Sequence, residues 1–276
     1  PARPPTARGR GARALGGPAG QGGRAGRGAR GVAFSSPPGH LPPVVAGILI
    51  TGATGFVGGH LIEALARNGM RARALVRETS DTALLERHGI ERQIGDLTDP
   101  VSLRRAIEDA GTVLHLAAAT RALRPDEFDA VNGAGTRRLV DAMLDAGGRR
   151  RLVYLSSLAA VGPRGDRAVT AEDEPRPITA YGRSKLEGER AALEAGGLSV
   201  AVLRAPAVYG PGDRDLLTFF RFADRGILPR VGSTERRLQF GHAADLAEGV
   251  LAAARSEATG VFHIAEPRAY EWSEVL

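Results

Sequence analysis

Cysteine is absent from the 276-residue sequence, and lysine occurs only once. Without cysteine, the chain has neither a disulfide framework nor a thiolate metal site. Its six histidines are scattered at spacings unlike those of metal ligands, so we expect no metal site. No run of about 18 apolar residues occurs, and we therefore expect no membrane span and a cytoplasmic location.

Acidic residues are missing from the first 43 positions, which carry seven arginines. Subtracting those seven charges from the formal +6 leaves −1 for residues 44–276, so we expect no nucleic-acid partner for that domain. Residues 1–43 are mostly Pro, Gly, Ala and Arg, a composition typical of a disordered extension. An RNA-binding arm or an organelle transit segment is the alternative interpretation. The segment has no apolar core of the kind that secretory signals need.

From Val44 onward, apolar runs of strand length alternate with patterns of helical period. We expect strands over residues 44–50, 71–76, 91–97, 112–119, 150–157 and 199–204. We expect helices over residues 56–69, 81–89, 99–111, 125–148 and 178–196. This alternation predicts an α/β fold with a doubly wound parallel sheet, a Rossmann domain that binds its ligand at the carboxyl ends of the strands.

The segment ITGATGFVGGHL, residues 50–61, joins the first strand to the first helix and contains three evenly spaced glycines. Gly52 permits a tight turn, Gly55 lets the backbone approach a pyrophosphate, and Gly58 lets the helix pack closely on the strand. The helix N-terminus then offers free N–H groups to phosphate. We therefore expect this loop to bind a dinucleotide through Gly52, Thr54, Gly55, Phe56, Val57 and Gly58.

Arg77 follows the second predicted strand, at the position that distinguishes the two nicotinamide cofactors. An acidic residue there would bind the ribose 2′-hydroxyl of NAD, whereas a guanidinium suits the 2′-phosphate of NADP. We expect NADP as the cofactor, while the neighbouring Glu78 keeps NAD open as an alternative.

The only lysine, Lys185, lies four residues after Tyr181 on a predicted helix, so the two side chains share one face. A nearby ammonium favours the phenolate and would lower the pKa of Tyr181. Tyr181 could then exchange a proton with an alcohol or ketone while a hydride moves to or from nicotinamide. Ser156 and Ser157 end the fifth strand, and because side chains alternate along a strand, we expect one of the two hydroxyls to face the substrate.

With these features the chain resembles the extended short-chain dehydrogenases/reductases, of the NAD(P)-dependent epimerase/dehydratase group. The matching motifs follow the family's order across residues 44–266. They are TGATGFVG (51–58), GDLTD (95–99), HLAA (115–118), VNGAGT (131–136), SSLAAVG (156–162), YGRSK (181–185), RAPAVYGPGD (204–213) and GHAADLAEGV (241–250).

The resemblance implies a role for individual residues. It assigns Ser157 as the catalytic serine, Tyr181 as the acid/base, and Lys185 as the group that binds ribose and tunes Tyr181. It also implies cofactor contacts in several strand-end loops, at Asp96, Leu97, Ala117, Ala118, Pro206 and Val208. Thr120, Ser157 and Tyr209 would border a small-molecule substrate.

Two departures from the family's patterns restrict the reaction. Leu158 and Ala159 stand where sugar dehydratases of the group carry an Asp–Glu pair, so we expect no dehydration. The segment before Gly162 lacks the tyrosine of many sugar epimerases and is similar to members that oxidise or reduce hydroxysteroid- or flavonoid-like alcohols and ketones. A nucleotide-sugar epimerase and a non-catalytic NAD(P)-binding relative are the alternatives.

The substrate-binding elements are expected at about residues 205–239 and 265–276, in a C-terminal region that looks small and truncated beside the family. In segment 216–240, phenylalanines and arginines alternate in a pattern that fits either a substrate lid or an amphipathic helix. The resemblance also implies a homodimer, formed through the helices around residues 125–146 and 178–196.

Overall fold

The computed structural model describes residues 47–165, 167–214, 217, 221–222, 224–227, 237–271 and 274, which all belong to one compact unit, Ala33–Leu276. The expected disordered extension over residues 1–43 lies outside the described residues, as does much of segment 216–240. In the described part of the chain, no helix is long and apolar enough to cross a membrane, and no cluster of potential ligands could hold a metal ion.

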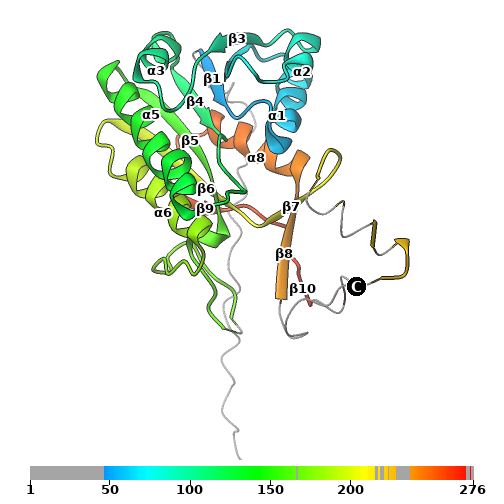
Figure 1. Ribbon diagram of the computed structural model, residues 1–276. Helices are drawn as coiled ribbons and strands as arrows, with labels where there is room; N and C mark the ends of the chain where they lie inside the picture. The colour runs from blue at the N-terminus through cyan, green and yellow to red at the C-terminus, as the bar shows by residue number, and fades with distance from the viewer. Residues whose placement is uncertain are drawn as a thin grey trace, which may run out of the picture. The chain divides into compact units, whose positions relative to one another are not determined.

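Seven parallel strands form the central sheet, in the order β3-β2-β1-β4-β5-β6-β9 (Figure 1). Their bounds are β1 (Ile48–Thr51), β2 (Ala72–Val76), β3 (Glu91–Ile94), β4 (Thr112–His115), β5 (Arg150–Ser157), β6 (Leu198–Ala205) and β9 (Gly260–His263). The strand order reverses between β1 and β4, which opens a crevice at their carboxyl ends. The predicted doubly wound parallel sheet is confirmed.

Helices cover both faces of this sheet. On one face α1 (Phe56–Arg67), α2 (Ala83–Arg87) and α8 (Ala243–Arg255) pack over one core, and on the other α3 (Pro100–Ile107), α5 (Ala134–Asp145) and α6 (Ala180–Leu193) pack over a second (Figure 1). Strand β1 contributes Ile48 and Ile50 to the first core and Leu49 to the second. A strand buried on both faces is a continuous apolar run, which is why the sequence pattern identifies it.

Several predicted elements end or break earlier than their sequence pattern suggests. The strand expected over 91–97 stops at Ile94, and the helix expected over 99–111 stops at Ile107. The strand expected over 112–119 stops at His115, and residues 116–119 are irregular. The helix expected over 125–148 is divided into α4 (Pro125–Phe128), a π-helical turn η1 (Asp129–Gly133) and α5. Such turns widen a helix locally and are frequent at functional sites.

A second, three-stranded sheet has the order β10-β8-β7, with bounds β7 (Ala207–Tyr209), β8 (Arg237–His242) and β10 (Ala269–Glu271). Together with α8 and β9, these strands were not predicted from the sequence. A short 3-10 turn, η2 (Leu158–Ala160), follows β5 and leads to the loop before α6.

Candidate active site

The glycine loop between β1 and α1 needs its glycines for steric reasons. Gly52 has a φ of +77°, and a Cβ on it would lie 2.5 Å from the backbone nitrogen of Ala117. A Cβ on Gly58 would lie 2.1 Å from the carbonyl oxygen of Gly52. Gly55 caps α1 without a side-chain hydrogen bond, and the first turn of the helix contains no acidic residue. The helix N-terminus is therefore free to attract phosphate.

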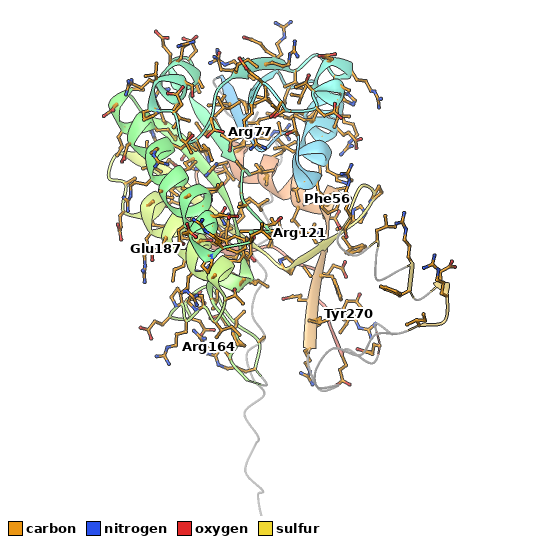
Figure 2. The ribbon with its side chains drawn as sticks, in the orientation of Figure 1. Phe56, Arg77, Arg121, Arg164, Glu187 and Tyr270 are labelled. Carbon is orange, nitrogen blue, oxygen red and sulfur yellow. The ribbon has the colours of Figure 1, made fainter. Side chains whose placement is uncertain are left out.

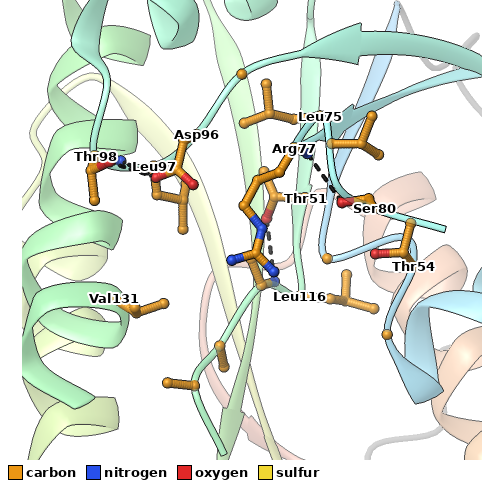
Figure 3. Close-up of a pocket in the computed structure, with 17 residues that line it drawn as sticks. Thr51, Thr54, Leu75, Arg77, Ser80, Asp96, Leu97, Thr98, Leu116 and Val131 are labelled. Carbon is orange, nitrogen blue, oxygen red and sulfur yellow. Dashed lines mark hydrogen bonds between the residues drawn. The ribbon is translucent and has the colours of Figure 1, made fainter. Parts of the chain in front are cut away.

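Beside this loop, at the carboxyl ends of the central strands, lies a cavity of about 460 Å³ (Figure 3). Eight of the predicted cofactor residues line it: Gly52, Thr54, Gly55, Arg77, Asp96, Leu97, Ala117 and Ala118. The lining is completed by residues to which the sequence motifs assigned no role, namely Thr51, Leu75, Val76, Ser80, Gly95, Thr98, Leu116, Ala119 and Val131. Gly52 and Gly55 line the cavity beside the free N-terminus of α1, a cradle that fits the pyrophosphate of a dinucleotide cofactor.

Arg77 extends into the cavity from the end of β2, with Asp96 on one side and Ser80 on the other (Figure 3). Its backbone nitrogen donates to Ser80 Oγ at 3.2 Å. The pKa of Asp96 lies below its usual range, chiefly because the Thr98 hydroxyl donates to it and also because Arg77 is near. The cavity wall thus presents one guanidinium and one ionised carboxylate to a ligand.

Tyr181 and Ser157 are brought together where β5 ends and α6 begins. Thr179 caps α6, accepting a hydrogen bond from Gly182 N at 2.9 Å, so Tyr181 falls in the first turn. Burial raises the pKa of Tyr181, while a hydrogen bond with Ser157 acts in the opposite direction. Ser156 instead contacts a carboxylate deeper in the fold, so Ser157 is the serine that faces Tyr181.

Lys185 is almost fully buried on the same helix, one turn after Tyr181. Its ammonium donates to the carbonyl oxygen of Leu155 at 2.8 Å and lies 4.2 Å from the centroid of the Tyr154 ring. Burial lowers the pKa of Lys185 to about 7, and Glu189 opposes this shift. The expected lowering of the Tyr181 pKa by Lys185 is wrong for the chain alone, because burial outweighs the other influences.

Asn132 is a site residue to which the sequence assigned no role, although its motif, VNGAGT, was part of the family resemblance. It is fully buried in the π-helical turn η1. Its Nδ2 donates to Ala119 O at 3.0 Å and to Ser184 Oγ at 2.9 Å, and its Oδ1 accepts from Ala119 N at 2.8 Å. The side chain therefore ties the cavity wall after β4 to the helix that carries Tyr181.

His115 forms a second buried link, between the end of β1 and α5. Its Nδ1 lies 2.6 Å from Thr51 Oγ1, and its Nε2 lies 2.9 Å from Thr136 Oγ1. The imidazole stacks on Tyr154 with ring centroids 5.2 Å apart. Burial lowers the pKa of His115 to about 3, so the ring is neutral at physiological pH.

Ser157, Tyr181 and Lys185 do not line this cavity, and the other predicted residues also lie outside its lining. Phe56, Val57 and Gly58 belong to the first turn of α1, while Pro206 stands between β6 and β7 and Val208 is in β7. Thr120 is exposed after the cavity wall. On the side of the small sheet, the hydroxyls of Tyr209 and Tyr270 donate to the two oxygens of Glu266, at 2.8 and 3.1 Å. Tyr270 lies on this sheet (Figure 2).

The model of the NAD dependent epimerase/dehydratase family matches residues 48–265. A ceramide reductase of Caulobacter vibrioides is 34% identical over 232 residues, covering 83% of this chain and 68% of the relative. The sterol demethylase protein B of Methylococcus capsulatus is 38% identical over 196 residues, 66% of this chain and 59% of the relative. The solved structure of MoeE5 with UDP-glucose and NAD has a TM-score of 0.71 and 32% identity, covering 83% and 79% of the two chains.

Proposed function

Because the chain belongs to the NAD dependent epimerase/dehydratase family and is an NAD(P)-dependent enzyme of the extended short-chain dehydrogenase/reductase type, we propose that it transfers a hydride between the cofactor and a secondary alcohol or ketone. Ser157, Tyr181 and Lys185 are the proposed catalytic residues. The observation that carries this proposal is the hydrogen bond between Tyr181 and Ser157 at the carboxyl end of β5. Tyr181 also lies one helical turn from the buried Lys185 on α6.

Tyr181 is well suited to act as a general acid. When bound, the nicotinamide cofactor supplies or accepts the hydride. Since burial raises its pKa, Tyr181 is protonated at neutral pH and can give its proton to the oxygen of a ketone as that oxygen gains negative charge. Ser157 donates a second hydrogen bond to the same oxygen, and solvent returns the proton to Tyr181. These roles favour the reductive direction.

We assign NADP as the cofactor, with Arg77 binding the 2′-phosphate. A guanidinium that extends into the cavity next to the hydroxyl of Ser80 supports this choice. The phosphate loop of Gly52, Thr54, Gly55, Phe56, Val57 and Gly58 would hold the pyrophosphate. Asp96 and Leu97 would contact adenine, and the nicotinamide half would contact Ala117, Ala118, Tyr181, Lys185, Pro206 and Val208.

The proposed substrate is a largely apolar ketone, bordered by Thr120, Ser157 and Tyr209. Two relatives support an apolar substrate class, since one is named a ceramide reductase and the other a sterol demethylase protein. Leu158 and Ala159, which follow Ser157 on the turn η2, are both apolar and only partly buried. Neither side chain could serve as the acid or base of a dehydratase.

A nucleotide-sugar epimerase is the second candidate, and the likeness to MoeE5 with UDP-glucose and NAD favours it. The two reactions differ in their net redox balance. A ketone reductase consumes one reduced cofactor per turnover, whereas an epimerase regenerates its cofactor and shows no net consumption. Incubation with UDP-glucose and a catalytic amount of NAD, followed by separation of the epimers, tests this second candidate directly.

The first experiment is a fluorescence titration of the purified chain with NADPH and NADH in parallel. Tighter binding of NADPH would support the assignment of Arg77 and justify a screen of apolar ketones by loss of NADPH absorbance. Preferential binding of NADH would favour the epimerase. Binding of neither cofactor would contradict both candidate functions.

We also propose that residues 44–276 form the enzyme domain, with residues 1–43 as an extension, and that two copies pair through α5 and α6. The partly exposed Leu144 near the end of α5 and Leu193 at the end of α6 support such pairing. Light scattering measures the mass of the assembly, and a monomer at micromolar concentration would contradict the dimer. Deletion of residues 1–43 should leave cofactor affinity unchanged, whereas loss of a salt-dependent affinity for RNA would assign the extension a function.

A further inference from the structure

Glu189 is a buried acidic residue that the proposed mechanism does not use. It lies one helical turn after Lys185 and two turns after Tyr181, so all three side chains project from one face of α6. Only 1% of its side chain is exposed. A carboxylate is costly to bury unless it is paired and hydrogen-bonded, so its partners are informative.

The partners of Glu189 come from both strands beneath the helix. Arg204 on β6 donates to the carboxylate through Nε, at 2.9 and 3.2 Å, and through Nη2, at 2.6 Å. Ser156 on β5 donates from its hydroxyl at 2.5 Å. Ser156 and Arg204 are direct neighbours in the parallel register of the two strands. One carboxylate therefore fixes α6 to β5 and β6 together.

The end of β5 meets α6 at three successive residues. Leu155 accepts a hydrogen bond from Lys185, Ser156 donates to Glu189, and Ser157 bonds to Tyr181. Ser156 and Ser157 are adjacent residues, and their partners Glu189 and Tyr181 lie on the same helix. A displacement of α6 at Glu189 would therefore also change the distance between Ser157 and Tyr181. The position of the proposed acid thus depends on the buried carboxylate.

The charge of Glu189 also acts on Lys185. Of the other titratable groups around Lys185, His115 from β4 is neutral at pH 7, and burial raises the pKa values of Tyr154 from β5 and of Tyr181 from α6, so both are protonated. Burial lowers the pKa of Lys185, and the negative charge of Glu189 acts in the opposite direction. Arg204 from β6 contacts this carboxylate and offsets part of its charge. His263 from β9, paired with Arg204 in the sheet, also interacts with both groups, and burial lowers its pKa.

We propose that Glu189, held by Arg204 and Ser156, is a positioning residue that orients α6 and favours the charged form of Lys185 beside the proposed catalytic tyrosine. This inference deepens the proposed function and rests on it for the roles of Tyr181 and Lys185. It predicts that the protonation of Lys185 changes when the carboxylate is neutralised, which a purely structural ion pair would not require.

The single lysine of the chain makes Lys185 directly measurable. Protein labelled with lysine carrying ¹³C at Cε gives one side-chain signal, whose chemical shift reports protonation as the pH is varied. For the unaltered chain we expect a midpoint near pH 7, since burial lowers the pKa of Lys185 to about 7. In Glu189→Gln the midpoint should fall by about one unit, because the opposite charge is gone.

Glu187→Gln is the matched control. Glu187 lies on the same helix but on its exposed side, in an exposed ion pair with Arg190 at 2.7 Å (Figure 2). Removing that charge should leave the midpoint of Lys185 unchanged, because solvent screens it. Equal midpoints in Glu189→Gln and the unaltered chain would overturn the proposal.

A double variant covers the case in which Glu189→Gln does not fold because Arg204 is left unpaired. Glu189→Gln with Arg204→Met removes both charges, a change that buried ion pairs often tolerate. Its midpoint should still fall, since Glu189 acts on Lys185 more strongly than Arg204 does, and an unchanged midpoint would contradict the proposal. The titration needs neither cofactor nor substrate, so a failure to find turnover would refute the proposed function and not this inference.

Discussion

Replacing Arg77 by glutamine should change which nicotinamide cofactor the chain prefers. The guanidinium extends into the cavity and is the cationic group among its lining residues in the described part of the chain. NADP and NAD differ only in the 2′-phosphate. If Arg77 binds that group, replacing Arg77 lowers the affinity for NADPH and leaves the affinity for NADH almost unchanged.

The size of this effect follows from the environment of Arg77. A hydrogen bond to a charged group contributes about 1.5–3 kcal/mol when it is protected from water. Arg77 is exposed, so solvent screening favours the lower part of that range. A loss of about 1.5–2 kcal/mol corresponds to a roughly 10- to 30-fold weaker affinity, since about 1.4 kcal/mol is a factor of ten.

The assay is a fluorescence titration of the unaltered chain and of two variants with NADPH and NADH. Arg87→Gln is the control, because Arg87 is exposed at the end of α2 and does not line the cavity. Of the two variants, we expect only Arg77→Gln to lower the affinity for NADPH, and its affinity for NADH should change by less than about threefold. Equal losses for both cofactors would refute the assignment of Arg77 to the 2′-phosphate.

Three further predictions follow from the described contacts. Tyr181→Phe should lower turnover by at least about 100-fold with cofactor affinity unchanged, and full activity in this variant would contradict the proposed acid role. Gly58→Ala should destabilise the fold by about 1–3 kcal/mol in urea unfolding, because its Cβ would lie 2.1 Å from Gly52 O. Gly59→Ala is the control, since the nearest atom to a Cβ there, 3.3 Å away, belongs to a flexible side chain. Equal effects of the two substitutions would disprove the steric argument. Burial lowers the pKa of His115 to about 3, below its ordinary value near 6.5, so its contribution to stability is present above pH 6.5 and is lost as the pH falls toward 3. Urea unfolding of His115→Gln should therefore depend less on pH in this interval, and an identical dependence would show that His115 does not titrate as inferred.

The sheet could be predicted from the sequence because parallel strands with two buried faces carry continuous apolar runs. Residues 48–51 are all buried, and three of these four residues are apolar, so the strand is easily identified in the sequence. Strand β9 was not predicted, since its four residues are only partly buried and follow α8, a helix that was not predicted either. In segment 125–148 the apolar period continued through η1, so the π-helical turn looked like ordinary helix.

The cofactor loop could be predicted for a different reason. Its chemistry resides in glycines, whose spacing after a strand is visible in the letters of the sequence, and the structure gives a steric cause for Gly52 and Gly58. Residues 116–119 also line the cavity, in the wall beside Gly52, and these apolar residues were indicated only through the HLAA motif, which assigned Ala117 and Ala118. Asn132, which holds that wall, was visible only as part of a motif without an assigned role.

Charged residues at the site were the hardest to interpret, because the sequence alone does not distinguish a buried charge from a solvated one. Glu187 and Glu189 stand two residues apart on α6, yet the first is exposed and the second is almost fully buried between two strands. The same burial explains why Lys185 has a lowered pKa and Tyr181 a raised one, the reverse of an argument from their spacing alone. In this site desolvation, more than proximity, determines which groups carry a proton, and the carboxylate of Glu189 is the feature of the described chain that counteracts it at Lys185.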